Sequence, residues 1–458
     1  MSAYPNMDRA AVAGAGLAGT LMALFLARRG VEVDLYERRR DPRGGGPTEG
    51  RSINLALSHR GIRALQAVDM ADALLAESIP MVGRMIHDES GRQELQPYGL
   101  RGECIYSISR RLLNERLLDA AEATGRVHLH FEHKVAGVEE HPTTLLVTPP
   151  GRKKPLVVQP DLLVAADGAF SAVRAAVQRR ERFSLSQEYL AYGYKELTIP
   201  PTAAGEFAMD PNALHIWPRH EFMMIALPNP DRTFTCTLFL PMEGEHGFGS
   251  LADRDDIERF FVRHFADARP LLPALHEEFV ANPVGSLVTV RCEPWTIGDR
   301  GLLLGDAAHA IVPFYGQGMN AAFEDCRLLD EHLMAAGDAR PLRDTLAAFA
   351  EHRKQDADAI AELAKLNFLE MRSHVRRRDW VLRRALHRTL HRIAPERWVP
   401  LYTMVTFSDT PYGEALKRAK RQEALLDKAL GVAGAGSLLG TLALGRWLRR
   451  KGRAGEDL

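Results

Sequence analysis

A glycine-rich segment near the start of the chain restricts the fold more than any other feature. Residues 10–37 read as an apolar strand, a turn, a helix and a second strand that ends at Glu37. The turn carries G-x-G-x-x-G at Gly14, Gly16 and Gly19. In a βαβ unit these glycines let backbone amides approach a pyrophosphate, and the acid binds ribose hydroxyls. The segment therefore predicts a dinucleotide-binding domain, without distinguishing FAD from NAD.

Two later segments favour FAD. Residues 161–174 form an apolar strand that leads into DGAFSAVR, and residues 301–325 form another that leads into GDAAH and GQGMN. Asp306 ends the second strand, where a carboxylate can bind the ribityl chain. A helix that begins near Met319 directs its positive end towards a ring that becomes anionic on reduction.

Composition excludes several classes of protein. The 458 residues include 59 Lys and Arg and 59 Asp and Glu, so no net charge attracts nucleic acid. Four cysteines lack C-x-x-C spacing, which argues against a zinc site or a disulfide framework and suits a reducing compartment. Because no secretory signal pattern begins the chain, we expect a cytoplasmic protein.

Three motifs carry a family resemblance. GAGLAG with Glu37, DGAFSAVR, and GDAAH with GQGMN are similar, in order and separation, to the FAD motifs of the single-component flavin aromatic hydroxylases. Further stretches, from GRSINLALSHRG at 50–61 to PLYTMVTFS at 400–408, resemble the kynurenine 3-monooxygenase family. Two alternatives remain, a hydroxylase of a different aromatic amino acid or acid, and a non-enzymatic FAD-fold binding protein.

The resemblance implies an activity. Members of the family are oxidoreductases of tryptophan catabolism and pyridine nucleotide biosynthesis. They use NADPH to reduce FAD, and O₂ then forms a flavin C4a-hydroperoxide that hydroxylates L-kynurenine at C3. The flavin performs the chemistry, so we expect no catalytic side chain, and the protein binds, orients and excludes water.

The order of elements predicts an α/β fold. We expect a Rossmann-like, doubly wound FAD-binding domain from residues 8–180 and 291–341. A mainly antiparallel β-sheet substrate domain is inserted at 181–290. A helical C-terminal part at 342–428 completes the substrate pocket, and an apolar, then basic, tail follows at 429–458. The oligomeric state stays open.

Predicted FAD contacts carry over from the family by motif. Arg110 can neutralise pyrophosphate charge, whereas backbone contacts leave little mark on sequence. The predicted set is Gly14, Gly16, Ala18, Gly19, Glu37, Arg38, Ala56, Arg110, Val135, Asp167, Asp306, Gly318, Met319 and Asn320.

The resemblance also implies a substrate pocket. Kynurenine is a zwitterionic amino acid on an aromatic ketone, so its pocket needs a carboxylate receptor and apolar walls. Arg84 in GRMIH matches the carboxylate-binding arginine, Tyr98 and Tyr402 match tyrosines that help to place the carboxylate, and Asn367 matches a polar contact. The predicted wall is Leu214, Ile225, Leu227, Thr237, Phe239, Phe314 and Met371. Tyr315 departs from relatives beside the expected reaction centre, and we favour packing over a bond from its phenol.

Three C-terminal features have competing interpretations. His387 and His391 have the spacing of helical metal ligands, but they lack the acid of H-E-x-x-H and a third ligand, so we predict a solvated helix face and no metal. Eight arginines at 372–392 also favour a solvated helix over a nucleic-acid site. The apolar stretch at 429–445 reaches only about 25 Å as a helix, so a soluble tail and a weak membrane contact through 429–453 both stay open.

Overall fold

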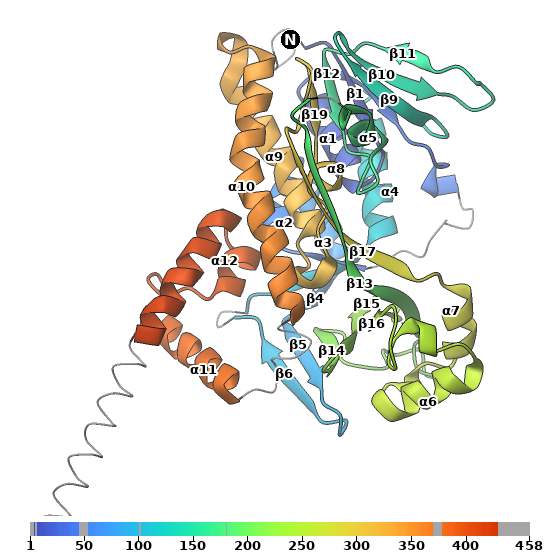
Figure 1. Cartoon of the computed structure of the whole chain (residues 1–458), viewed down its shortest axis with the longest axis vertical. Coiled ribbons are helices and arrows are strands. Elements are labelled where there is room, and N and C mark those ends of the chain that lie inside the picture. Colours follow the sequence, from blue (N-terminus) through green and yellow to red (C-terminus); the bar gives the residue numbers. More distant parts are fainter. Residues whose placement is uncertain are drawn as a thin grey trace, which may run out of the picture.

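The computed structural model describes residues 4, 7–44, 54–99, 102–179, 181–369 and 378–428. Predicted site residue Met371, the tail at 429–458 and part of the arginine run lie outside these ranges. Figure 1 shows one sheet with its helices in the upper half, a second sheet in the lower half, and C-terminal helices at the side.

A six-stranded sheet forms the dinucleotide-binding half. Its order is β18-β19-β12-β1-β2-β8, and all neighbours run parallel except β18 and β19. The strands are β1 Arg9–Ala13, β2 Glu32–Tyr36, β8 Val127–His130, β12 Leu162–Ala165, β18 Thr296–Ile297 and β19 Gly301–Leu303. β1, β12 and β19 are almost entirely buried, as is typical of strands covered on both faces.

Helices cover this sheet, and α1 packs against both α4 and α9. They are α1 Leu17–Arg28, α4 Arg110–Ala123, α5 Ala172–Val177, α8 Asp306–His309 and α9 Gly318–Ala336. A three-stranded sheet, β9 Lys134–Glu140, β10 Thr143–Thr148 and β11 Leu156–Val158, flanks the upper half. The predicted α/β class with a doubly wound FAD-binding part is confirmed.

A seven-stranded sheet of order β17-β13-β16-β15-β14-β5-β6 forms the lower half. Its strands are β5 Gly83–His87, β6 Gln93–Pro97, β13 Ser184–Ile199, β14 Ala213–Arg219, β15 Phe222–Pro228, β16 Phe234–Pro241 and β17 Gly285–Glu293. It is antiparallel except where β5 runs parallel to β14. The predicted boundary at 181–290 leaves β5 and β6 out of this sheet, because their pairing with β14 joins segments that are far apart in sequence.

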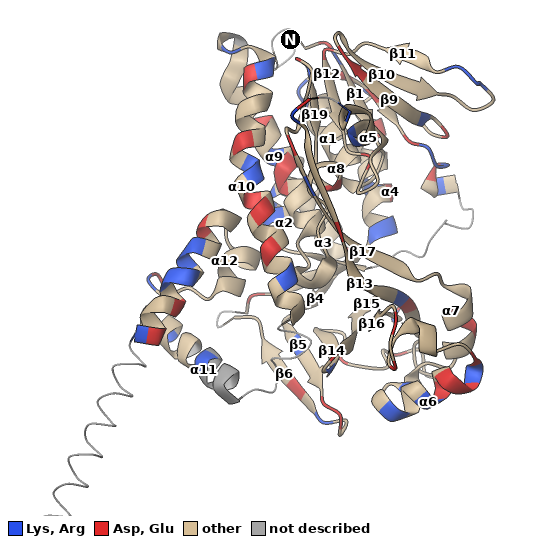
Figure 2. Cartoon of the chain, in the orientation of Figure 1, with Lys and Arg blue, Asp and Glu red and all other residues tan. Residues whose placement is uncertain are grey.

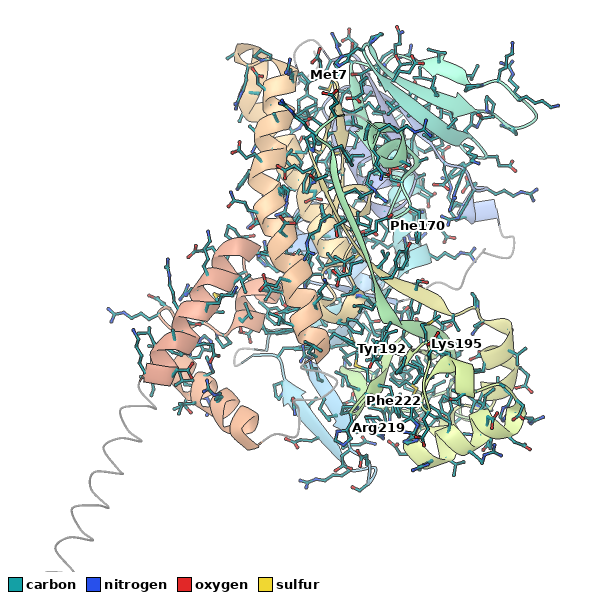
Figure 3. The ribbon with its side chains drawn as sticks, in the orientation of Figure 1. Met7, Phe170, Tyr192, Lys195, Arg219 and Phe222 are labelled. Atoms are coloured by element: carbon teal, nitrogen blue, oxygen red, sulfur yellow. The ribbon has the colours of Figure 1, made fainter. Side chains whose placement is uncertain are left out.

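The register of this sheet separates two faces. Lys195, Arg219 and Phe222 lie towards α6 Arg254–His264 and α7 Leu275–Ala281 (Figure 3), where Lys195 Nζ donates to the Asn282 carbonyl at 2.7 Å. Tyr192 lies on the opposite face, and its ring contacts that of Phe368 at 5.0 Å between centres. Because side chains alternate along a strand, the opposite face is left for the dinucleotide-binding half.

Smaller elements connect the two sheets. β3 Asn54–Leu57, β4 Ile79–Met81 and β7 Ile105–Ser109 form a three-stranded sheet. Helices α2 His59–Gln66 and α3 Ala71–Ala76 follow β3. Short 3₁₀ helices are η1 Pro42–Gly44, η2 Phe248–Ser250, η3 Arg269–Leu271, η4 Pro313–Tyr315 and η5 Gly337–Ala339.

The C-terminal part is helical, with α10 Leu342–Leu369, α11 Arg378–Ile393, α12 Leu401–Phe407 and a helix at 412–428. Figure 2 shows acidic and basic residues interspersed along α10. His387 Nε2 lies 2.7 Å from Glu423 Oε1, and His391 Nδ1 lies 2.7 Å from the Trp398 carbonyl. Both histidines are half-buried, so this face packs against the following segment instead of being solvated as predicted.

The described part of the chain lacks two features. No helix there is both long and apolar enough to cross a bilayer. The same residues contain no group of three or more His, Cys, Asp or Glu side chains that could hold a metal ion.

Candidate active site

The glycine-rich turn has the shape that a pyrophosphate needs. Gly14 has φ of +96°, and a Cβ there would lie 2.6 Å from the Ala166 carbonyl oxygen. A Cβ on Gly19 would lie 1.9 Å from the Gly14 carbonyl oxygen, whereas a Cβ on Gly16 would meet no atom within 4 Å. Gly16 precedes α1, whose first turn, including Ala18, has no side-chain cap. The turn thus combines close backbone packing with open space at a helix N-terminus, which fits a phosphate group.

Glu37 lies beside this turn at the end of β2. Its Oε2 accepts from the Ala15 amide at 3.1 Å and its Oε1 from the Arg39 amide at 3.0 Å. The His133 amide donates to the Glu37 carbonyl at 2.8 Å, which brings the start of β9, with buried Val135, to the same edge. Arg38 is exposed. The structure thus places three predicted FAD contacts, Glu37, Arg38 and Val135, at one edge of the sheet.

The turn before Asp306 is held by a residue that sequence analysis did not single out. Asp325 is buried on α9 and accepts from the Gly305 amide at 3.2 Å and from Arg353 Nε at 2.7 Å, and His309 Nε2 lies 2.6 Å away. Burial raises the pKa of Asp325, but the charges of His309 and Arg353 outweigh it and lower the pKa to about 2. Asp306 itself is exposed.

Arg174 joins two of the predicted motifs, and the sequence did not indicate this role. It comes from DGAFSAVR, and its Nη1 donates to the Ala307 carbonyl at 2.7 Å, within GDAAH. Burial lowers its pKa. Since the arginine and its acceptor lie in separate motifs, only the fold reveals the bond.

Asp167 acts locally as a helix cap. Its Oδ2 accepts from the Ala172 amide at 2.7 Å and from the Val173 amide at 3.2 Å, at the start of α5. Burial raises the pKa of Asp167, and the hydrogen bond from Ser171 opposes that rise. Its carboxylate thus shapes the loop, and direct contact with FAD stays a prediction.

The GQGMN segment is organised by Asn320. The buried amide donates to the Ala56 and Gly316 carbonyls, each at 2.8 Å, and its Oδ1 accepts from the Ser58 amide at 2.9 Å. This places predicted contact Ala56 beside the start of α9, where Gly318 and Met319 are the first residues. One side chain therefore holds strand β3 against the helix expected to face the flavin.

Arg110 is exposed as the first residue of α4. Burial raises the pKa of Tyr194, Glu196 adds to that rise, and the positive charge of Arg110 opposes it. The charge of Arg110 therefore acts on Tyr194 of β13. Tyr194 pairs with Phe239, so it lies on the face of the large sheet that carries the predicted substrate wall.

The predicted carboxylate receptor lies among aromatic rings. The Arg84 guanidinium carbon lies 4.7 Å from the centre of the Tyr402 ring and 5.8 Å from that of Tyr98. The two rings stack at 5.3 Å with their planes 16° apart. Burial raises the pKa of Tyr98 well above its ordinary value, Tyr402 adds to this rise, and Arg84 opposes it. The structure thus brings together the three residues predicted to hold a carboxylate.

The sheet register aligns the predicted wall. Arg84 pairs with Leu214, Ile225 with Thr237, and Met223 with Phe239, so these side chains share one face. Leu214 and Ile225 pack against both apolar clusters that border this region, and Leu227 is buried in one of them.

Aromatic rings close the far end of the wall. Phe314 lies 4.9 Å from Phe239 and 4.2 Å from Phe368, and Asn367 Nδ2 donates to the Phe314 carbonyl at 2.7 Å. Tyr315 stacks on Tyr402 at 5.7 Å, which supports the predicted packing. Phe368 was missed because an aromatic residue on a helix leaves no signal that separates a pocket wall from core.

The fold and the site together define a flavoprotein of the aromatic hydroxylase type, with an FAD-binding half and an arginine that lies against aromatic rings. A family model described as FAD binding domain matches residues 8–364. Kynurenine 3-monooxygenase of Salinispora tropica is 47% identical over 97% of this chain and 97% of its own length. The enzyme of Sus scrofa is 44% identical over 92% of this chain and 88% of its own. This chain belongs to the kynurenine 3-monooxygenase family.

Solved structures agree on the fold. A 2-methyl-3-hydroxypyridine-5-carboxylic acid oxygenase is 21% identical, with a TM-score of 0.66 over 84% of this chain and 93% of its own. A probable FAD-dependent monooxygenase of Pseudomonas aeruginosa is 20% identical, with a TM-score of 0.63 over 80% of this chain and 96% of its own.

Proposed function

We propose that this protein hydroxylates L-kynurenine at C3. L-kynurenine, NADPH, a proton and O₂ give 3-hydroxy-L-kynurenine, NADP⁺ and water. The observation that carries the proposal is the position of Arg84 against Tyr98 and Tyr402, on the face of the sheet that also presents the apolar wall. A guanidinium at one end of an aromatic pocket suits a ligand that joins a carboxylate to an aromatic ring.

Different residues bind the carboxylate and the aromatic ring of the substrate. Arg84 receives the carboxylate through two parallel hydrogen bonds, and the hydroxyls of Tyr98 and Tyr402 complete the receptor. Because burial keeps the Tyr98 hydroxyl protonated, it donates to the carboxylate. Phe239 and Phe314 hold the aromatic ring and exclude water.

FAD is the cofactor that the glycine turn, Glu37 and the Asp306 turn would hold. When bound, it takes a hydride equivalent from NADPH and activates O₂ as an electrophile. The chain contributes position: Asp325 holds the turn before α8, Asn320 holds the turn after η4, and the buried Phe314 and Tyr315 lie in η4 between these turns. We propose that the remaining residues of the predicted FAD set also contact the cofactor.

The decisive experiment follows the product. FAD-loaded protein with NADPH, kynurenine and ¹⁸O₂ should yield hydroxylated kynurenine with one labelled oxygen, detected by mass spectrometry. The same assay with 2-methyl-3-hydroxypyridine-5-carboxylate and 4-hydroxybenzoate tests the alternative of a different aromatic acid. Labelled product from either acid but not from kynurenine would reassign the substrate, and bound FAD without any labelled product would favour a binding protein.

Contact with a membrane is a separate proposal for residues 429–453. It rests on their apolar then basic sequence alone. Flotation of the full chain and of a chain ending at residue 428 with anionic liposomes tests it, and equal flotation of the two would exclude this contact.

A further inference from the structure

Arg60 is a buried arginine on α2 that contacts two separate parts of the protein. It is 2% exposed, and its Nε donates to the Val405 carbonyl at 3.2 Å while Nη2 donates to that of Thr410. Its Nη1 forms an ion pair with Glu324 on α9. The ring of Tyr412 lies 4.0 Å from the guanidinium carbon. Arg60 thus joins α9 to the segment at 405–412.

That segment includes the end of α12, the helix that carries Tyr402. α12 spans Leu401–Phe407, has no side-chain cap at its start, and is followed by an extended Ser408. A helix of this length is not stable alone, so tertiary contacts decide its position. Val405 lies one helical turn after Tyr402, and Arg60 is bonded to its carbonyl.

On the α9 side, the ion pair between Arg60 and Glu324 is held in place by a neighbouring charge. Glu324 lies on α9, which begins at Gly318 where the flavin is expected, and Arg353 Nη2 lies 2.9 Å from its second oxygen. A buried charge that loses its partner is costly, so this cluster holds Arg60 in one place. Two further residues of α2, His59 and Arg63, contact Asp409 at 3.1 and 2.8 Å. Because those two ion pairs are largely exposed, they contribute little to the stability of the contact between α2 and the segment at 405–412.

We propose that Arg60 is a positioning residue for substrate recognition. By tying α12 to α9, it holds the Tyr402 ring against Arg84, without touching the substrate itself. This inference rests on the proposed function, because it concerns the affinity of the same carboxylate receptor.

The test compares Arg60→Lys with Arg29→Lys in the FAD-loaded full chain. Arg29 bonds Asp330, also on α9, at 2.8 Å, and no bond joins it to 401–413 within the described residues, so it controls for an arginine-to-lysine change against α9 alone, at a more exposed position. A lysine at position 60 cannot reach Glu324 and both carbonyls together. We expect KM for kynurenine to rise about tenfold, with kcat changed less than about threefold. Amide hydrogen exchange at 401–413 should become faster in Arg60→Lys and stay unchanged in Arg29→Lys.

Three outcomes would overturn the proposal. They are an unchanged KM with unchanged exchange at 401–413, an equal rise in KM in both variants, and a fall in kcat at constant KM. If Arg60→Lys does not fold, Arg60→Gln takes its place, because its amide can still donate to one carbonyl while Glu324 keeps Arg353 as its partner. It should show the same rise in KM, and a wild-type KM in it contradicts the proposal. If the wild type does not hydroxylate kynurenine, the proposed function fails, and exchange at 401–413 still decides the role of Arg60.

Discussion

The guanidinium of Arg84 lies 4.7 Å from the centre of the Tyr402 ring, although the two residues come from opposite ends of the chain. β5 supplies the charge and α12 supplies the ring. A cation against an aromatic face is held in place before any ligand arrives, which lowers the cost of ordering it.

Arg84→Ala should lower kcat/KM for kynurenine about 100-fold, mainly through KM, because the variant loses charge-assisted hydrogen bonds to the carboxylate. Steady-state kinetics measures the effect. Arg92→Ala, an exposed arginine in the turn between β5 and β6, is the control and should behave as wild type. Unchanged kinetics in Arg84→Ala would remove this residue from the receptor.

Asn367→Asp should destabilise the Phe314 turn. The amide donates to the Phe314 carbonyl at 2.7 Å, and a carboxylate oxygen there would face another acceptor. We expect a loss of about 2 kcal/mol in the free energy of unfolding, measured in urea, together with a higher KM. Asn212→Asp makes the same change where Nδ2 donates to the Pro80 carbonyl at 2.9 Å in an exposed position, so its cost should be smaller. Equal costs would contradict the role of burial at Asn367.

Gly16→Ala should lower the affinity for FAD, whereas Gly19→Ala should lower the stability of the apoprotein. The new Cβ at position 16 meets no protein atom within 4 Å, so the apoprotein should keep its melting temperature while FAD affinity falls, because the methyl group occupies the pyrophosphate space. At position 19 the Cβ would lie 1.9 Å from the Gly14 carbonyl oxygen, so the apoprotein itself should lose stability. Thermal unfolding of apoprotein and FAD fluorescence titration separate the two. Wild-type FAD affinity in Gly16→Ala would place the pyrophosphate elsewhere.

Asp325 should make acid stability depend on pH in a defined window. Its pKa falls from an ordinary 3.8 to about 2, so its contribution is present above about pH 4 and is lost as pH falls through 2. The shift corresponds to about 2 kcal/mol at neutral pH. The difference in unfolding free energy between wild type and Asp325→Asn, measured in urea, should shrink as pH falls below 4.

The sequence indicated those parts of the site whose requirements are local. Gly14 and Gly19 must be glycine because a side chain would collide with backbone a few residues away or after the neighbouring strand. The spacing of the motif alone indicates this requirement. Arg84 and Tyr402 were identified through family motifs that surround each residue. Neither motif says that the two side chains meet.

Contacts between distant segments were decided by tertiary structure alone. The pairing of β5 with β14 moved residues 83–97 into the large sheet, and the bonds of Arg60 to Val405 and of Asp325 to Gly305 joined separate motifs. The physical reason is that periodicity shows which face of an element is apolar but not which partner covers it. The sequence by itself therefore determined a dinucleotide-binding fold and the chemistry of its ligands, whereas the folded chain decided how Arg84, Tyr402 and the flavin-facing turns lie relative to one another.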